Sequence, residues 1–150
     1  RDLARMRPVV SDAMFDAMRY WLAAAEARGQ HNRVEQATLT RIQPARVRRD
    51  VYFDAITLRL HAHCLDYTVN QAGDVLSGSR ETPRRFSEYW TLIRGRHPGE
   101  RRGDGDGCPS CGAPMHLTMA GNCEHCGTHL TLGEFDWVLS KIEQDESYRG

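Results

Sequence analysis

The sequence predicts an α+β fold in which an N-terminal helix packs in a curved antiparallel sheet. Three observations lead to this prediction. A long stretch with helical spacing of apolar residues comes first, strand-like stretches follow it, and two Cys-x-x-Cys pairs lie near the C-terminus. A small cysteine-rich unit and a short C-terminal helix are therefore expected after the sheet.

The composition is that of a globular protein. The 150 residues include 40% hydrophobic and 27% charged residues, and the formal net charge is zero. This balance argues against a disordered chain and against a general nucleic-acid binder. The sequence contains no apolar run of about 18 residues and no signal-peptide pattern, so this fragment is expected to be soluble and to lack a transmembrane segment.

The first predicted element is a helix that begins at Pro8 and ends at Gly29. Proline suits the first turn of a helix, and glycine suits the position after its last turn. Between them, apolar residues recur at helical spacing, at Val10, Met14, Met18, Trp21, Leu22 and Ala25. We interpret this stripe as a face that packs in the core rather than as a cofactor-binding surface.

The pattern changes to strands after His31. Residues 32–51, with Pro44 in their middle, fit an edge strand or a bulged strand. Residues 52–64 alternate clearly, with one face made of Ile56, Leu58, Leu60, Ala62 and Cys64 and the other of Thr57, Arg59, His61 and His63. The apolar phase slips by one residue after Cys64, which indicates a β-bulge. Residues 84–95 are predicted to be a further strand of this sheet.

The chain is predicted to have three parts. Residues 1–97 form the α+β domain, residues 98–107 form a linker rich in glycine and charge, and residues 108–150 form the cysteine-rich part. This last part is expected to end in a short amphipathic helix, because four apolar residues share one helical side after Gly133: Phe135, Val138, Leu139 and Ile142.

Four cysteines carry the clearest chemical signal. They are spaced Cys-x2-Cys-x11-Cys-x2-Cys, with a glycine after each pair, at Cys108, Cys111, Cys123 and Cys126. A tight turn brings the first and fourth residues of Cys-x-x-Cys together, so four thiolates can surround one ion as a tetrahedron. The spacing predicts a zinc ribbon with Zn²⁺ as cofactor. Iron in the same cage, or a pair of disulfides, is the alternative.

The predicted zinc site is structural rather than catalytic. Four sulfurs fill the coordination shell, whereas catalytic zinc keeps one position for water. Three nearby histidines, His116, His125 and His129, are expected at the surface or beside the ligands rather than as ligands. Thiolates available for zinc also favour a reducing compartment, the cytoplasm.

Residues 8–97 contain three specific features: Asp66-Tyr67, Gly78 and a run that contains Phe86, Glu88, Tyr89, Trp90 and Arg94. In these features the sequence resembles the Tim forty-four (Tim44)-like domain. The C-terminal ribbon is similar to the zinc-ribbon extension of some bacterial members. The resemblance implies a cone-shaped α+β fold, related to the nuclear transport factor two-like superfamily. It also implies a membrane-associated binding module without an established catalytic set.

These observations lead to one main functional hypothesis and two others. The main one is a non-enzymatic binding or scaffold domain of a membrane-associated bacterial protein, at the cytoplasmic face, that binds a protein partner or anionic lipid. The alternative is a cone-fold enzyme of cyclase or isomerase type that uses His61 or His63 with Asp66 in a pocket. Nucleic-acid binding ranks last, because the ribbon, residues 108–127, contains no Lys or Arg.

Overall fold

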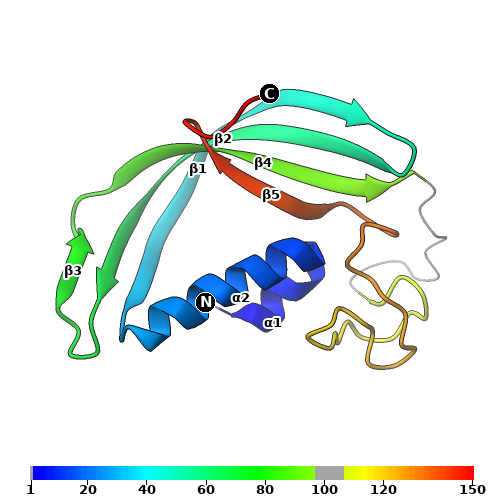
Figure 1. Ribbon diagram of the computed structural model, residues 1–150, viewed down its shortest axis with the longest axis horizontal. Coiled ribbons are helices and arrows are strands. Elements are labelled where there is room, and N and C mark those ends of the chain that lie inside the picture. The colour runs from blue at the N-terminus through cyan, green and yellow to red at the C-terminus, as the bar shows by residue number, and fades with distance from the viewer. Residues whose placement is uncertain (1, 97–106) are drawn as a thin grey trace.

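The structure is a computed structural model, and it describes residues 2–96 and 107–150. Helical segments lie beneath a strongly curved sheet, and the cysteine-rich segment lies beside them (Figure 1). The helical elements are α1 (Leu3–Met6), a 3-10 turn (Arg7–Val9) and α2 (Asp12–Ala27), and the strands are β1 (His31–Arg49), β2 (Phe53–Val69), β3 (Val75–Gly78), β4 (Arg84–Gly95) and β5 (Val138–Gln144). The predicted α+β class is confirmed.

Helix α2 begins four residues later than the sequence pattern predicts. Pro8 lies in the 3-10 turn, and Val10 is extended because its backbone bridges to Leu139 of β5. The helix then starts after Ser11, whose Oγ accepts a hydrogen bond of 3.3 Å from the N–H of Met14. This N-cap satisfies one of the free amides at the helix start.

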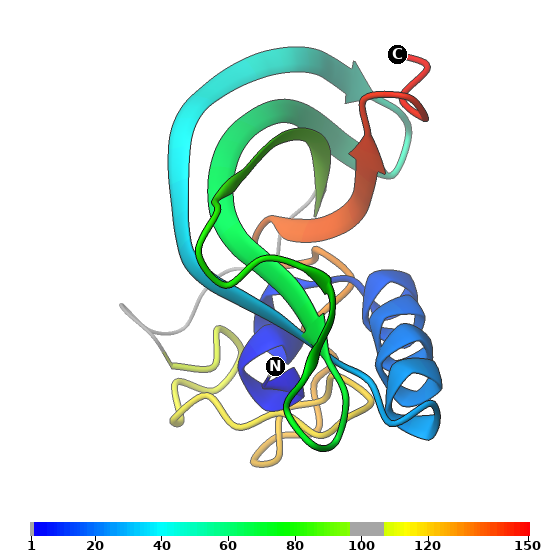
Figure 2. The ribbon, with the colours of Figure 1, turned by 90° about the vertical axis from the view of Figure 1, so that its left-hand side faces the viewer.

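The sheet is antiparallel, with the order β1-β2-β4-β5, and β3 pairs with β2. Figure 2 shows how strongly β1 and β2 bend, with the helices at the foot of the arc. β1 lies at an edge of the sheet, as Pro44 predicts. The predicted irregularity near Cys64 is present, but the additional residue lies in β1, where Gln36 has a φ of 51°.

One face of the sheet packs against the helices. Leu58 pairs with Trp90, and Trp90 pairs with Ile142, so these three side chains share a face. Trp90 and Ile142 contact the buried core cluster Val10, Phe15 and Leu139. Glu88 also lies on this apolar face, where its carboxylate accepts hydrogen bonds from Trp90 Nε1 at 3.0 Å and from Gln144 Nε2 at 2.8 Å.

The apolar stripe of α2 is only partly covered. Phe15 is 1% exposed and meets Leu139, whereas Trp21, which was expected in the core, is 67% exposed. Met14 is half-buried against the same cluster. The helix therefore packs through its N-terminal half, where the extended segment at Val10 joins it to β5.

The predicted C-terminal amphipathic helix is wrong, because residues Val138–Gln144 form strand β5. Leu139 pairs with Leu92 and Ile142 pairs with Trp90, although three positions separate Leu139 from Ile142. The register shift between these pairs adds one residue to β5, so two residues three positions apart face the same side. The apolar residues of a bulged strand can therefore have the same spacing as those of an amphipathic helix.

β5 also bears on the predicted three-part division of the chain, residues 1–97, 98–107 and 108–150. The strand lies in the last part, yet it extends the sheet that the first part builds. The predicted linker lies outside the described residues, except for Gly107. The division into parts stays a prediction.

Candidate metal centre

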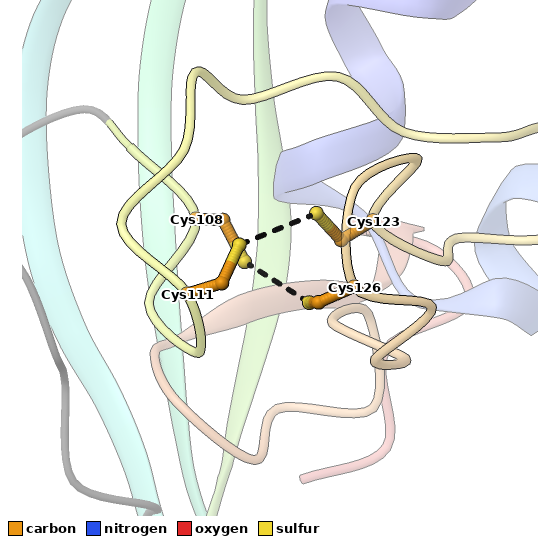
Figure 3. Close-up of side chains that lie close together, drawn as sticks. All are labelled: Cys108, Cys111, Cys123 and Cys126. Atoms are coloured by element: carbon orange, nitrogen blue, oxygen red, sulfur yellow. Dashed lines mark hydrogen bonds between the residues drawn. The ribbon is translucent and has the colours of Figure 1, made fainter.

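The four predicted cysteines come together in space. Their sulfur atoms all lie within 4.8 Å of one another. The Sγ atoms of Cys108 and Cys126 are 3.9 Å apart, those of Cys111 and Cys123 are 4.0 Å apart, and the two pairs face each other from two loops (Figure 3). A tetrahedron of sulfurs with Zn–S distances of about 2.3 Å has edges of about 3.8 Å. The cluster is therefore the size that a single four-coordinate ion requires, and all four cysteines are free thiols.

Both cysteine pairs use the same local turn. In the first pair, the N–H of Gly112 donates to the carbonyl of Cys108 at 2.7 Å; in the second, the N–H of Gly127 donates to the carbonyl of Cys123 at 2.9 Å. The two glycines have φ values of 75° and 72°, in the left-handed region that glycine adopts without strain. This explains why a glycine follows each pair in the sequence.

The first cysteine of each pair is buried and the second is exposed. Cys108 is 0% exposed and Cys123 is 1% exposed, and both pack with Leu130 in a small core. Cys111 and Cys126 face solvent. Two members of the four-sulfur cluster are therefore embedded in the packing of their segment.

The surroundings shift the pKa values of two of the thiols in opposite directions. The Oγ1 of Thr128 lies 3.3 Å from the Sγ of Cys126, and hydrogen bonds from this side chain and from the Thr128 backbone lower the pKa of Cys126 to about 6. The pKa of Cys111 is raised to about 11: a hydrogen bond with the backbone of Ala113 lowers it, but partial loss of hydration and the neighbouring thiols raise it by more. Binding of a cation must therefore displace protons from part of the cluster.

A second group of polar residues joins the ribbon to the N-terminal segment, and we call Arg7, Asp12, His129 and Thr131 the docking cluster. Arg7 is 2% exposed; its Nε donates to the carbonyl of Met119 at 2.9 Å, and its Nη2 forms an ion pair with Asp12. Asp12 also accepts a hydrogen bond of 2.7 Å from Thr131 Oγ1 and lies 3.0 Å from Nε2 of His129.

Gly121 completes the surroundings of Arg7. A Cβ atom at this position would lie 2.2 Å from Thr131 Oγ1 and 2.4 Å from Arg7 Nη2, and φ at Gly121 is 84°. The guanidinium also lies 4.6 Å from the centre of the Phe15 ring. The backbone at Gly121 can therefore approach Arg7 only because the residue has no side chain.

Sequence reasoning missed the docking cluster. Arg7 contacts Met119, which lies 112 positions away, and no local pattern predicts a contact over that distance. His129 was expected at the surface or beside the ligands, and the structure places it between Asp12 and Asn122. The buried charge of Arg7 could not be foreseen, because an arginine just before a helix is ordinarily exposed.

The histidines and the aspartate of the enzyme hypothesis do not form a catalytic pair. His61 and His63 alternate with the residues that face α2, so they lie on the opposite face of the sheet. His61 Nε2 lies 3.0 Å from Gln43 Oε1, while Asp66 accepts from Asn32 at 2.9 Å and pairs with Arg84 at 2.9 Å. Both histidines border an open hollow of about 710 Å³, whose lining mixes basic and acidic side chains.

Comparison with known proteins identifies the family. The family model of the Tim44-like domain matches residues 1–104, so the chain belongs to this family. The ribbon and β5 lie beyond the matched residues. Neither the comparison with curated proteins nor the comparison with solved structures finds a match.

Among residues 2–96 and 107–150, no helix has the length and apolarity that a membrane crossing requires.

Proposed function

We propose that this protein is a non-enzymatic binding or scaffold domain of a membrane-associated bacterial protein, with Zn²⁺ as a structural ion. Cys108, Cys111, Cys123 and Cys126 are the proposed ligands. The observation that carries the proposal is the convergence of four thiols in a chain of the Tim44-like family. Four sulfur ligands leave no coordination position for water or substrate, which favours architecture over catalysis.

Energetics support a structural ion. The segment around the cysteines has a small core of its own, in which Leu130 packs with the two buried cysteines. A unit of this size does not bury enough apolar surface to fold alone. Structural zinc contributes an apparent binding free energy of about 10 kcal/mol or more, which offsets the entropy of ordering the two loops.

The surface of β1 supports anionic lipid or an acidic protein surface as the partner. Arg41, Arg46 and Arg48 are exposed on this edge strand, and they pair with His61, Thr57 and Ala55, so they lie on the same face of the sheet. Arginines near an anionic membrane each contribute about 1 kcal/mol. We place the domain at the cytoplasmic face, where thiolates remain reduced.

The first part of the test measures the metal of the purified protein. We expect one zinc per chain by elemental analysis, and loss of zinc in Cys108→Ser and Cys123→Ser. Cys64→Ser is the matched control, because Cys64 is buried in the sheet and lies outside the cluster. Iron in place of zinc, or cysteines oxidised to disulfides, would contradict the proposed cofactor.

The second part measures binding of the zinc-loaded protein to vesicles. We expect flotation with vesicles that contain phosphatidylglycerol, and at least about fivefold weaker binding when Arg46 and Arg48 are both changed to Glu. A matched change of the exposed Arg28 to Glu, at the end of α2, should have little effect. If the vesicles do not bind and pull-downs recover no protein partner either, the binding role is wrong.

A further inference from the structure

We propose that the docking cluster couples metal binding in the ribbon to the docking of helix α2 on the sheet. In the metal-loaded protein, the ribbon holds Arg7 and Asp12; without the ion, it releases them together with the start of α2. This inference rests on the proposed metal ion in the four-cysteine site. It assigns to Arg7, Asp12, His129 and Thr131 a positioning role between that site and the helix.

Two paired backbone segments, one ending at Cys123 and the other beginning at Thr128, hold both the second cysteine pair and the docking cluster. The N–H of Cys123 donates to the carbonyl of Thr128 at 2.9 Å, and the next pair along this ladder joins Asn122 to His129. Further along, the N–H of Leu130 donates to the carbonyl of Gly121 at 2.9 Å. Ordering Cys123 and Cys126 around an ion therefore also orders the residues that contact Arg7.

On the N-terminal side, the docking cluster brackets the start of α2. Arg7 and Asp12 flank Val10 and Ser11, and the N–H of Ser11 donates to the carbonyl of Leu139 at 2.9 Å. Val10 forms the parallel bridge to the same residue. Arg7 and Asp12 thus lie on either side of the short segment through which the start of α2 meets β5.

The coupling is strong because Arg7 is buried and charged. A buried ion that loses its partners is strongly unfavourable. The docked position of Arg7 therefore depends on Asp12 and on the carbonyl of Met119, beside a longer hydrogen bond of 3.4 Å from Arg7 Nη1 to the carbonyl of Val10. The carbonyl comes from the ribbon, and Thr131, just beyond the ribbon, donates a hydrogen bond to Asp12. When these paired segments become disordered, hydration of the Arg7 guanidinium is favoured over its docked arrangement.

Coupling of this kind is reciprocal. The factor by which docking of α2 strengthens metal binding equals the factor by which metal binding strengthens docking of α2. Release of α2 would uncover Phe15 and Leu139, the centre of the small core, and the edge of β5 that Val10 and Ser11 cover. Metal occupancy would thereby control access to an apolar surface and to a strand edge.

The first experiment is hydrogen exchange of the whole protein before and after zinc removal by a chelator. We expect amides of α2 and β5 to exchange at least about tenfold faster without zinc, while those paired between β2 and β4 keep their protection. Unchanged exchange in α2 and β5 after complete zinc removal would overturn the inference. This measurement uses the unaltered sequence, so it does not depend on whether a variant folds.

The second experiment measures zinc affinity by competition with a chromogenic chelator. Arg7→Met removes the charge but keeps much of the volume, and we expect at least about tenfold weaker zinc binding. Arg28→Met, at the exposed far end of α2, is the matched control and should bind as the unaltered protein does. Gly121→Ala, which places a Cβ against Arg7, should weaken zinc binding in the same direction.

The outcomes separate the inference from the proposed function. If the purified protein binds no zinc, both fail. If it binds zinc through the four cysteines but Arg7→Met binds as tightly as the unaltered protein, the structural ion stands and the coupling is wrong. If both the exchange of α2 and the affinity of Arg7→Met change as expected, the coupling is supported.

Discussion

Asp50 shows how a single carboxylate sets the local geometry of the sheet. It lies in the hairpin between β1 and β2, and its Oδ1 accepts hydrogen bonds of 2.7 Å from the N–H groups of both Tyr52 and Phe53. The hydrogen bond from Phe53, then that from Tyr52, holds the pKa of Asp50 below its ordinary value of 3.8. An aspartate in this turn therefore stabilises the hairpin most when it is ionised.

Asp50→Asn is expected to destabilise the protein in a pH-dependent way. Because the pKa of Asp50 is lower in the folded state than in the unfolded state, the charge contributes stability above pH 3.8, and this contribution is lost as the pH falls through the folded-state pKa. The urea midpoint of Asp50→Asn should thus lie below that of the unaltered protein at neutral pH, and the two should converge in acid.

Comparison of two proteins at each pH removes the effect of metal loss, because both proteins keep the four cysteines. Asp16→Asn, at an exposed position of α2, is the control and should follow the unaltered protein at every pH. A difference between Asp50→Asn and the unaltered protein that stays constant from neutral to acid pH would show that the charge of Asp50 is not involved.

At the scale of elements, β5 shows how one additional residue in a strand can give apolar residues the spacing of a helix. Val138, Leu139 and Ile142 follow the spacing of a helix, and the sequence analysis predicted one. The bulge in β5 places Leu139 and Ile142 on the same side of a strand. β1 was predicted correctly, because Pro44 indicates an edge position independently of periodicity.

Leu139→Ala is the prediction that tests the packing of β5. Leu139 is 9% exposed and lies in the core cluster with Val10 and Phe15, so its truncation should cost about 2–5 kcal/mol in the free energy of unfolding. Val47→Ala, at a β1 position that is 72% exposed, is the control and should change the free energy by no more than about 0.5 kcal/mol.

Chemical denaturation of the zinc-loaded proteins, with tryptophan fluorescence as the signal, would measure both changes. Trp90 contacts the core cluster and provides the local probe. If Leu139→Ala and Val47→Ala proved equally mild, β5 would not pack as the structure describes.

At the scale of the whole molecule, the sheet is built from both ends of the chain. β4 ends at Gly95, and its neighbour β5 begins at Val138, after the cysteine-rich segment. The N-terminal segment contacts both β5 and the ribbon, through Val10 and Arg7. We therefore expect the predicted parts 1–97 and 108–150 to depend on each other for stability.

A fragment of residues 1–97 tests this dependence. It lacks β5, so β4 would have an unpaired edge and Phe15 would lose Leu139 from its core. We expect the fragment to unfold without a cooperative transition in circular dichroism and to aggregate through the exposed edge. A sharp transition with the stability of the whole protein would instead support the three-part division as independent domains.

Several features followed from the sequence because their causes are local. The turn of each Cys-x-x-Cys pair needs only a few consecutive residues, so the meeting of the sulfurs within a pair was predictable from spacing. The clear alternation in β2 and the Pro44 of β1 likewise predicted strands. The resemblance of residues 84–95 and their neighbours to the Tim44-like domain agrees with the family match.

The sequence by itself therefore determined the α+β class, the strands β1, β2 and β4 and the four-cysteine cluster, since spacing and periodicity are properties of neighbouring residues. Only the tertiary structure decided that β5 is a strand, that Trp21 is exposed and that Arg7 is buried against the ribbon. These three outcomes depend on contacts between segments far apart in the chain, where the partner and not the local pattern sets the lowest free energy.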